Sequence, residues 1–300
     1  MPLTTLNYDL LAVDLDGTLL GPDGSVSEAN VAAVRAAADA GLRVVVCTGR
    51  GLVECRRILD RVWGDHLPQA GPVIVAGGAI TADPATGRTL HRFQMPEGMV
   101  RRAVARVHGA GLAAMVLKDP AAAGFDYLVV EGAGGHPLDP VTAWWFEMLH
   151  VSFKTVVSLE QDEHPEQTVR VGACADAEHA TRLAMHFREE FGAEATLHSF
   201  PAVVAKDLGT RRVHILEVFD AAANKWTAVE RLAAEMGVPT DRVAAIGDEI
   251  NDAPMIAGAG LGIAMGNAIE QVRGLAQRVT KPNTESGVAH AIDRILSGAW

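Results

Sequence analysis

The most constraining feature of this sequence is an alternation of short apolar strands with helices up to about residue 80. The apolar runs are short, and the run at 43–47 is β-branched and too short for a helix. The segments between the runs carry the start and stop signals of helices. The expected order is strand 8–13, a helix from the Ser25–Glu28 capping box to residue 40, strand 43–47, helix 51–62 and strand 72–75. Apolar strands joined by helices predict an α/β fold with a parallel sheet covered on both faces.

The pattern changes after about residue 80, where strands follow one another without helices between them. Residues 80–82 and 88–92 flank a turn-rich segment and predict a hairpin. Beyond it we expect helix 96–109, strands near 112–117 and 126–131, helix 140–149, strands near 155–159 and 167–173, helix 177–191, and strands near 194–199 and 202–206. Consecutive strands of this kind indicate a separate α+β module.

The parallel pattern then resumes in the last third of the chain. The expected elements are strand 213–218, helix 225–236, strand 243–246, short strands near 260–264 and 277–280, and a last helix at 286–296. One domain is therefore interrupted by another. We expect a core made of residues 1–83 and 209–300, and an inserted domain made of residues 84–208.

The composition bears on partners and compartment. The 26 basic and 37 acidic residues give a formal charge of −11 without a basic block, so we expect no nucleic-acid partner. No run of about 18 apolar residues occurs, so we expect no membrane partner. Cys47, Cys55 and Cys174 are widely spaced and form no CxxC pair. They are expected to be buried thiols in a reducing compartment, which indicates a cytoplasmic protein.

Side chains able to do chemistry collect at the carboxyl ends of the predicted parallel strands, or at the start of the following helix. In an open parallel sheet this edge is where ligands bind. Gly17 indicates that the chain turns directly after Asp14 and Asp16, so their carboxylates can point in different directions. The residues concerned are Asp14, Asp16, Thr48, Lys225, Asp248, Asn251 and Asp252.

The carboxylates from two of these strands need positive charge between them. Asp14 and Asp248 would repel each other unless a cation lay nearby. Mg²⁺, a hard ion that prefers oxygen ligands, meets this need. Lys225 adds a point charge, and Thr48 adds a hydroxyl and a backbone N–H. An in-line nucleophile, cations around the phosphoryl oxygens and a proton carrier are what phosphoryl transfer requires.

Four motifs in this order resemble those of the haloacid dehalogenase superfamily of phosphatases, in particular its Cof-type members with a large inserted cap (class IIB). They are Asp14-Leu-Asp-Gly-Thr18, Thr48-Gly-Arg50, Lys225 and Gly247-Asp-Glu-Ile-Asn-Asp252. Residues 262–268 and 279–289 are similar to the tail of that group. The resemblance implies a Rossmann-like parallel-sheet core with an inserted α+β cap. It also implies hydrolysis of a small phosphate monoester, such as a sugar phosphate, through an aspartyl phosphate.

The resemblance implies a role for each motif residue. Asp14 would be the nucleophile, and Asp16 the general acid and base. Asp14, Asp248 and the backbone carbonyl of Asp16 would hold Mg²⁺. The substrate phosphate would be bound by Thr48, Gly49, Lys225 and Asn251, with support from Thr18 at the first turn and from Asp252, which would orient Lys225 or a water on the metal.

The sequence leaves alternative functions and the roles of several residues open. A phosphotransferase or mutase would pass the phosphoryl group to a sugar, and a receiver-like signalling module would keep it on an aspartate. Arg50 is expected to be structural or solvated, and Lys206 is a further candidate for a substrate contact, whereas Arg211 and Arg212 are expected to be surface charges. Trp226 and Gly77 depart from the family pattern and are expected near the mouth of the site. The substrate and the oligomeric state are not predicted.

Overall fold

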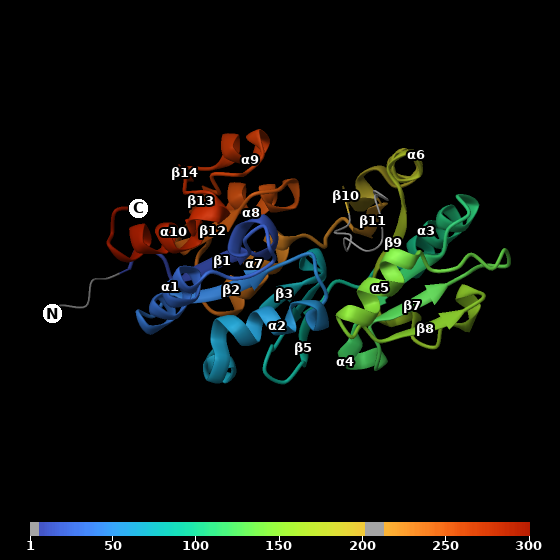
Figure 1. Ribbon diagram of the computed structural model, residues 1–300, viewed down its shortest axis with the longest axis horizontal. Coiled ribbons are helices and arrows are strands. Elements are labelled where there is room, and N and C mark those ends of the chain that lie inside the picture. Colours follow the sequence, from blue (N-terminus) through green and yellow to red (C-terminus); the bar gives the residue numbers. More distant parts are fainter. Residues whose placement is uncertain (1–5, 202–212) are drawn as a thin grey trace. The chain divides into compact units, whose positions relative to one another are not determined.

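The computed structural model describes residues 6–201 and 213–300 (Figure 1). The chain divides into two compact units. One consists of Met1–Leu90 with Asn224–Trp300, and the other of His91–Ala223, so the second unit is inserted into the sequence of the first. Predicted features that lie outside the described residues are the strand near 202–206, Lys206, Arg211, Arg212 and the boundary at 208–209.

In the described residues, the first unit contains an eight-stranded sheet of order β14-β13-β12-β1-β2-β3-β4-β5. Neighbouring strands pair in parallel from β14 to β3, and β3 pairs with β4 in antiparallel fashion. The predicted parallel sheet is thus confirmed. The strands are β1 (Leu10–Asp14), β2 (Arg43–Cys47), β3 (Val73–Val75), β4 (Ile80–Ala82), β5 (Thr89–Arg92), β12 (Val243–Gly247), β13 (Leu261–Ala264) and β14 (Arg278–Val279).

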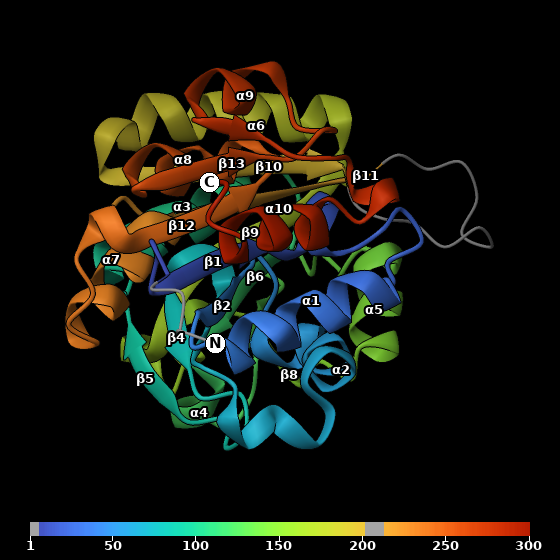
Figure 2. The same ribbon diagram turned by 90° about the vertical axis from the view of Figure 1, so that its left-hand side faces the viewer.

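Helices cover both faces of this sheet. Figure 2 shows α1, α2 and α10 on one face and α7 and α8 on the other, and α1 packs against both α2 and α10. The helices are α1 (Glu28–Asp39), α2 (Leu52–Trp63), α7 (Lys225–Glu235), α8 (Ala253–Gly258), α9 (Glu270–Leu275) and α10 (Gly287–Leu296). The short helices α8 and α9 were not predicted, because six residues are too few to show a helical period.

The start of α1 differs from the prediction. Ser27 is the N-cap, because its hydroxyl accepts the backbone N–H of Asn30 at 3.2 Å. Ser25 instead donates its hydroxyl to Asp23, at 2.8 Å, within the preceding turn. The capping box predicted at Ser25 is therefore wrong by two residues. The predicted end is confirmed, since Gly41 follows the helix with a φ of +90°.

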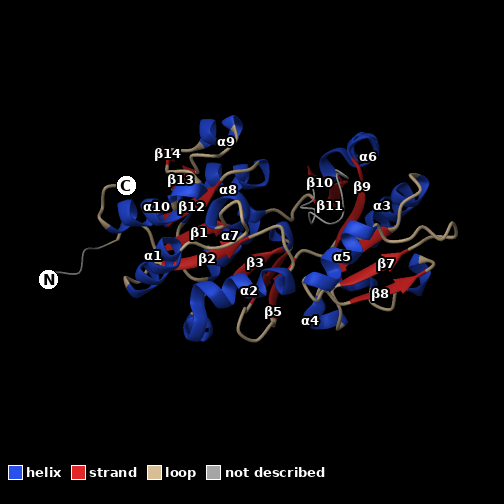
Figure 3. Cartoon of the chain, in the orientation of Figure 1, coloured by secondary structure: helices blue, strands red, loops and turns tan. Residues whose placement is uncertain are grey.

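The second unit is built on a six-stranded sheet of order β10-β11-β9-β6-β7-β8 in the described residues. Its pairs are antiparallel except for β7 with β8 (Figure 3). The predicted α+β module is thus confirmed. Its elements are α3 (Glu97–Gly109), β6 (Ala114–Lys118), α4 (Pro120–Ala123), β7 (Tyr127–Val130), α5 (Pro140–Met148), β8 (Phe153–Val156), β9 (Thr168–Asp176), α6 (Ala177–Phe191), β10 (Ala195–Pro201) and β11 (Val213–Asp220).

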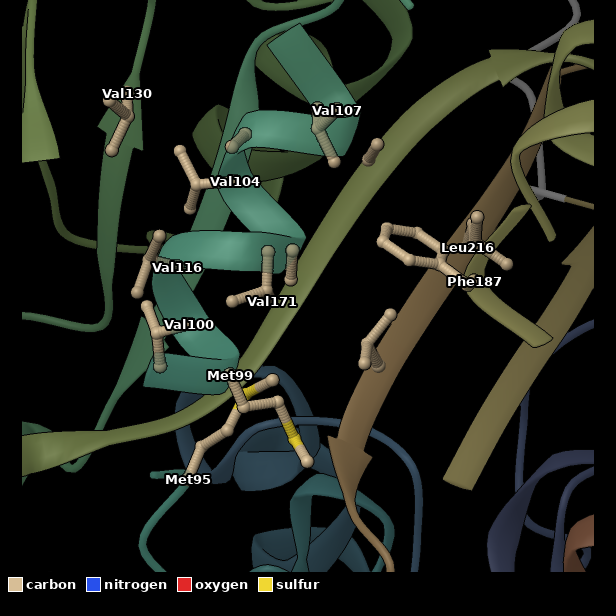
Figure 4. Packing of buried hydrophobic residues seen from close by; sticks show 14 of the residues in the cluster. Met95, Met99, Val100, Val104, Val107, Val116, Val130, Val171, Phe187 and Leu216 are labelled. Carbon is tan, nitrogen blue, oxygen red and sulfur yellow. The ribbon is translucent and has the colours of Figure 1, made fainter. Parts of the chain in front are cut away.

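One face of this second sheet carries a buried apolar core under α3 and α6. Figure 4 shows Val104 of α3 near Val116 of β6 and Val171 of β9, and Phe187 of α6 beside Leu216 of β11. The core forms because alternate residues of each strand point to this face. The other face is covered in part by α5, whose Phe146 ring lies 4.8 Å from that of Tyr127.

The strand β11 corrects the predicted chain course. Residues 213–218 were expected to resume the parallel pattern of the core, and this expectation is wrong. β11 pairs in antiparallel fashion with both β9 and β10 of the second unit. Its apolar run is buried along most of its length, and such a run looks alike in parallel and antiparallel sheets. The return to the first unit comes only with Asn224, directly before α7.

Two expectations from composition can be checked in the structure. Cys47, Cys55 and Cys174 are all buried and none forms a disulfide, as predicted. Among the described helices, none combines the length and the apolar character that crossing a bilayer requires.

Candidate active site

The turn after β1 positions the first acidic pair. The strand ends at Asp14, and Leu15–Leu19 forms one wide helical turn in which Asp16 is extended (φ −77°, ψ 120°). Gly17 has a φ of +79°, which favours glycine. A β-carbon at this position would lie 2.2 Å from Oδ2 of Asp248. Glycine therefore lets the turn close directly onto the end of β12.

Lys225 links two of the predicted motifs. Its ammonium donates to Oδ1 of Asp14 and to Oδ1 of Asp252, both at 2.6 Å, and its side chain is only 1% exposed. Lys225 is the first residue of α7, and Asn224 caps this helix by accepting the N–H of Thr227. The sequence therefore directs a buried cation to the carboxyl edge of the sheet.

A second glycine brings this helix start close to the sheet. At Gly78, which has a φ of +104°, a β-carbon would lie 2.2 Å from the carbonyl oxygen of Asn224. No other residue type would allow this approach without a shift of the backbone. The loop after β3 therefore determines where α7 begins, and with it the position of Lys225.

Asp252 is held on both carboxylate oxygens. Oδ1 accepts from Lys225, and Oδ2 accepts the backbone N–H groups of Asp248 at 2.9 Å and Glu249 at 3.1 Å. Gly247 makes room for this side chain, because a β-carbon there would lie 2.5 Å from the Cβ of Asp252. Asp252 thus closes the turn after β12 and orients Lys225.

Asp248 is held from the opposite side by the first motif. The hydroxyl of Thr18 donates to its Oδ1 at 2.8 Å. The amide of Asn267 lies 3.4 Å from its Oδ2 and donates to the carbonyl of Gly17 at 2.8 Å. These contacts place Asp248 beside the turn that carries Asp14 and Asp16.

The resulting acidic cluster has too little positive charge of its own. Ligand oxygens of Asp14, Asp248 and Asp252 all lie within 4.8 Å of one another, and Lys225 contacts two of them, Asp14 and Asp252. Burial raises the pKa of Asp14 well above its usual range; the charges of Asp252 and Asp248 raise it further, and Lys225 opposes them. Burial likewise raises the pKa of Asp248 to about 7, although the hydrogen bond from Thr18 opposes this.

The same charges act on Lys225 in the opposite sense. Burial alone would lower the pKa of its ammonium, but the attraction of Asp14 and Asp252 outweighs burial and raises the pKa. Lys225 is therefore a permanent cation at neutral pH. A further hard cation with oxygen ligands fits the remaining carboxylate charge, so the cluster suits a divalent metal ion.

Three predicted phosphate ligands lie on the same sheet edge, with one correction. Thr48 follows β2, which pairs with β1 so that Cys47 is level with Asp14. The backbone N–H of Thr48 donates to the carbonyl oxygen of Ile74 at 2.8 Å. The expectation that this N–H faces a ligand is therefore wrong. The Thr48 side chain is buried, and the adjacent Gly49 is half-buried. Oδ1 of Asn251, predicted as a third ligand, is buried and has no hydrogen-bond partner among the described residues.

The structure adds a partner for Asp16 that was not predicted. Arg50 was expected to be structural or solvated and not a phosphate ligand, and its guanidinium forms a forked ion pair with Asp16. The side chain of Asp16 thus points to Arg50. The pairing could not be read from the sequence, since the two residues lie 34 positions apart on different turns.

Two asparagines of the tail segment also support the site. Asn267 contacts Asp248 and Gly17 as described, and its own Oδ1 accepts the N–H of Asn283 at 2.8 Å. Asn283 donates its side-chain amide to the carbonyl of Leu20, also at 2.8 Å. The tail therefore braces the turn of the first motif. The similarity of residues 262–268 and 279–289 to the family was the signal that could have identified them.

Trp226 and Gly77, which depart from the family pattern, lie in different surroundings. The ring of Trp226 packs against α8, where a β-carbon on Gly258 would lie 2.3 Å from it. Gly77 has a φ of +67°, and its N–H donates to the carbonyl of Thr48 at 2.9 Å. Trp226 is thus part of the packing between α7 and α8, whereas Gly77 lies directly beside the second motif.

Comparisons with known proteins agree with this arrangement. The haloacid dehalogenase-like hydrolase family matches residues 11–292 of the chain. The 5-amino-6-(5-phospho-D-ribitylamino)uracil phosphatase YwtE of Bacillus subtilis is 27% identical, and the alignment covers 97% of this chain and 99% of that protein. The similarity therefore extends over both units.

Solved structures show the same fold. A haloacid dehalogenase-like hydrolase from B. subtilis, 26% identical, has a TM-score of 0.73 over 95% of this chain and 99% of its own. A sugar phosphatase of haloacid dehalogenase subclass IIB, 20% identical, has a TM-score of 0.72 over 95% of this chain and 98% of its own. The predicted fold and family are confirmed: the chain belongs to the haloacid dehalogenase-like hydrolases, and it is similar along its length to members that are phosphatases.

Proposed function

We propose that this protein hydrolyses phosphate monoesters of small metabolites, with Mg²⁺ as cofactor and a phosphoryl group held transiently on Asp14. The observation that carries the proposal is the contact of Lys225 with Asp14 and Asp252 within a buried cluster of three carboxylates. A carboxylate nucleophile, a buried cation and room for a metal are the parts that phosphoryl transfer uses. Membership of the hydrolase family supports the same reaction.

The metal would be held by Asp14, Asp248 and the backbone carbonyl of Asp16. The fit rests on the excess of carboxylate charge and on the raised pKa of Asp248, both of which a divalent cation would relieve. When bound, Mg²⁺ would neutralise charge on the transferring phosphoryl group. Asp252, whose two oxygens are already occupied, would act only by orienting Lys225.

In the first half-reaction, an oxygen of Asp14 would attack phosphorus while the bond from phosphorus to the ester oxygen breaks. Asp16 would give a proton to the departing alkoxide, which is too basic to leave as an anion. The phosphoryl oxygens would be bound by Lys225, the hydroxyl of Thr48, Gly49 and Asn251. The buried and unpartnered Oδ1 of Asn251 supports its assignment, because such an atom is costly without a ligand or a water.

In the second half-reaction, water would attack phosphorus of the aspartyl phosphate, and the bond to Asp14 would break. Asp16, now a carboxylate, would take the proton of this water and return to its starting state. Inorganic phosphate then leaves. One carboxylate thus serves as nucleophile and the other as proton carrier, which agrees with their different environments, buried for Asp14 and exposed for Asp16.

Metal binding should be visible in the stability of the protein, with a defined dependence on pH. The pKa of Asp248 is higher in the folded protein than its ordinary value of about 3.9, so the folded state binds more protons between about pH 4 and 7. Its contribution therefore lowers the free energy of unfolding as pH rises through this window. Saturating Mg²⁺ should remove this decrease in the free energy of unfolding, because the metal neutralises the charge of Asp248. We therefore expect Mg²⁺ to raise the melting temperature by about 5 °C more at pH 8 than at pH 5.

The control for this measurement is Asp248→Asn, which removes the titrating group and a metal ligand together. Its melting temperature should respond little to Mg²⁺ at either pH. An equal effect of Mg²⁺ on the wild-type protein at both pH values would contradict a metal bound by these carboxylates.

The reaction itself is tested with a panel of phosphorylated metabolites, in the presence of Mg²⁺ or of a chelator. We expect inorganic phosphate as the product, at a rate that depends on Mg²⁺. Addition of sugar acceptors distinguishes the alternative, because a phosphotransferase or mutase would yield a new phosphorylated sugar instead of phosphate. A stable phosphoprotein without turnover would indicate a receiver-like module. No phosphate release from any ester would refute the proposal.

The substrate class is inferred from the relatives. YwtE is named for a phosphorylated ribitylamino-uracil, a small metabolite with a single phosphate. We therefore place phosphorylated sugars and ribityl compounds first in the panel. The three buried thiols, which form no disulfide, favour a reducing compartment and hence the cytoplasm.

A further inference from the structure

Arg50 holds the carboxylate of Asp16 in a fixed, forked geometry. Its Nε donates to Oδ2 at 2.9 Å and its Nη2 to Oδ1 at 2.5 Å, so both carboxylate oxygens are engaged by one planar group. Such forked pairs impose direction as well as charge. The Asp16 side chain is 56% exposed, and without a partner it would be free to change rotamer.

The backbone of Arg50 is itself fixed. Its N–H donates to the hydroxyl of Thr48 at 3.1 Å, and its carbonyl accepts the N–H of Ala76 at 2.8 Å. The next residue, Gly51, is tied to Glu54 at the start of α2 by a hydrogen bond of 2.9 Å. The guanidinium therefore extends from a rigid point between β2 and α2 and reaches the turn that follows β1.

We propose that Arg50 is a positioning residue that keeps Asp16 in place for proton transfer. The proposal rests on the proposed function, in which Asp16 gives a proton to the leaving alkoxide. Proton transfer needs the carboxyl group within hydrogen-bond reach of the ester oxygen. A side chain that exchanges between rotamers is therefore an inefficient general acid. Arg50 contributes little to stability, because the pair is partly exposed, and its effect is on geometry.

This role predicts a dependence on the leaving group. An alkyl phosphate releases a strongly basic alkoxide and needs the proton of Asp16, whereas p-nitrophenyl phosphate releases a stable anion and does not. The first half-reaction alone depends on the leaving group, so it is measured as release of the alcohol or phenol in a single turnover. There Arg50→Ala should slow phosphorylation by an alkyl phosphate by about tenfold, and by p-nitrophenyl phosphate by less than about twofold. The second half-reaction, in which Asp16 acts as base, should slow equally for both esters. The Kd of either ester should change little.

Two further variants separate positioning from other roles. Arg50→Lys keeps a positive charge but cannot form the fork, so it should restore only part of the loss with the alkyl ester. In protein that already carries Asp16→Ala, adding Arg50→Ala should cause no further loss, because the group that it positions is gone. Arg61→Ala is the matched control: Arg61 lies in the last turn of α2 and forms an exposed ion pair with Glu28, and its kinetics should equal those of the wild type.

Several results would overturn the inference. Equal losses with both esters in the first half-reaction would show that Arg50 supports the site as a whole. A raised KM with unchanged kcat would make it a substrate ligand, and additive losses in the double variant would separate it from Asp16. Failure of the proposed function is distinct, because the wild-type protein would then release no phosphate from either ester. Arg50→Lys remains informative should Arg50→Ala not fold, since a loss there in the first half-reaction with the alkyl ester alone supports the fork and no loss contradicts it.

Discussion

Replacement of Asp14 by asparagine is expected to abolish phosphate release, with a fall in kcat of at least about 10⁴-fold. The amide is close in shape to the carboxylate and can still accept a hydrogen bond from Lys225, but it is a very weak nucleophile. The loss should therefore occur in a folded protein. The measurement is the rate of phosphate release from the best substrate of the panel.

A matched control lies at the other end of the same segment. Asp9 precedes β1 and pairs with Arg242 at the opposite edge of the sheet, so Asp9→Asn should retain wild-type turnover. Thermal unfolding of both variants reports whether they fold. Substantial activity in folded Asp14→Asn protein would mean that another group, or water itself, attacks the phosphorus.

Replacement of Lys225 by methionine should cause the largest loss of stability. Lys225 is buried between Asp14 and Asp252, and its removal leaves these carboxylates without their cation. Breaking a buried ion pair from one side costs about 3–5 kcal/mol, because the remaining charge stays in a poorly hydrating environment. We expect a decrease of this size in the free energy of unfolding in urea, together with a severe loss of turnover.

The pH dependence of this loss identifies its cause. Carboxylates left without Lys225 would have a still higher pKa in the folded state than in the unfolded state. The folded variant would then bind more protons, and its free energy of unfolding would fall as pH rises. The deficit against the wild type should thus be smaller at pH 5 than at pH 8. Lys281→Met, at an exposed position, is the control, and a deficit that does not change with pH would argue for lost packing instead of unpaired charge.

The convergence of the site could be predicted because parallel strands end at a common edge. Asp14 ends a buried strand, Thr48 and Asp248 each follow one, and the short runs that form β1, β2 and β12 are β-branched or apolar. The location of Lys225 at a helix start was likewise evident. Local sequence was sufficient here, because the order of strand and helix limits where a side chain can lie.

Features that depend on distant partners could not be predicted. The assignment of 213–220 to the second sheet requires the identity of its neighbours β9 and β10, which local hydrophobicity does not reveal. The pairing of Arg50 with Asp16 and the brace formed by Asn267 join turns from different parts of the chain. The shift of the helix cap to Ser27 was a local error, since Ser25 and Ser27 are both acceptable N-caps and the turn at Asp23 engages the first of them.

The central claim, that Asp14 carries the phosphoryl group, is tested most directly by trapping. In Asp16→Ala protein, p-nitrophenyl phosphate should still phosphorylate the enzyme, but the second half-reaction lacks its base, so the phosphoenzyme should accumulate. Acid quenching and borohydride reduction convert an aspartyl phosphate to homoserine, which mass spectrometry can locate in the tryptic peptide of residues 1–35. The account predicts homoserine at position 14. Homoserine at another aspartate, or unmodified Asp14 in an enzyme that turns over, would contradict it.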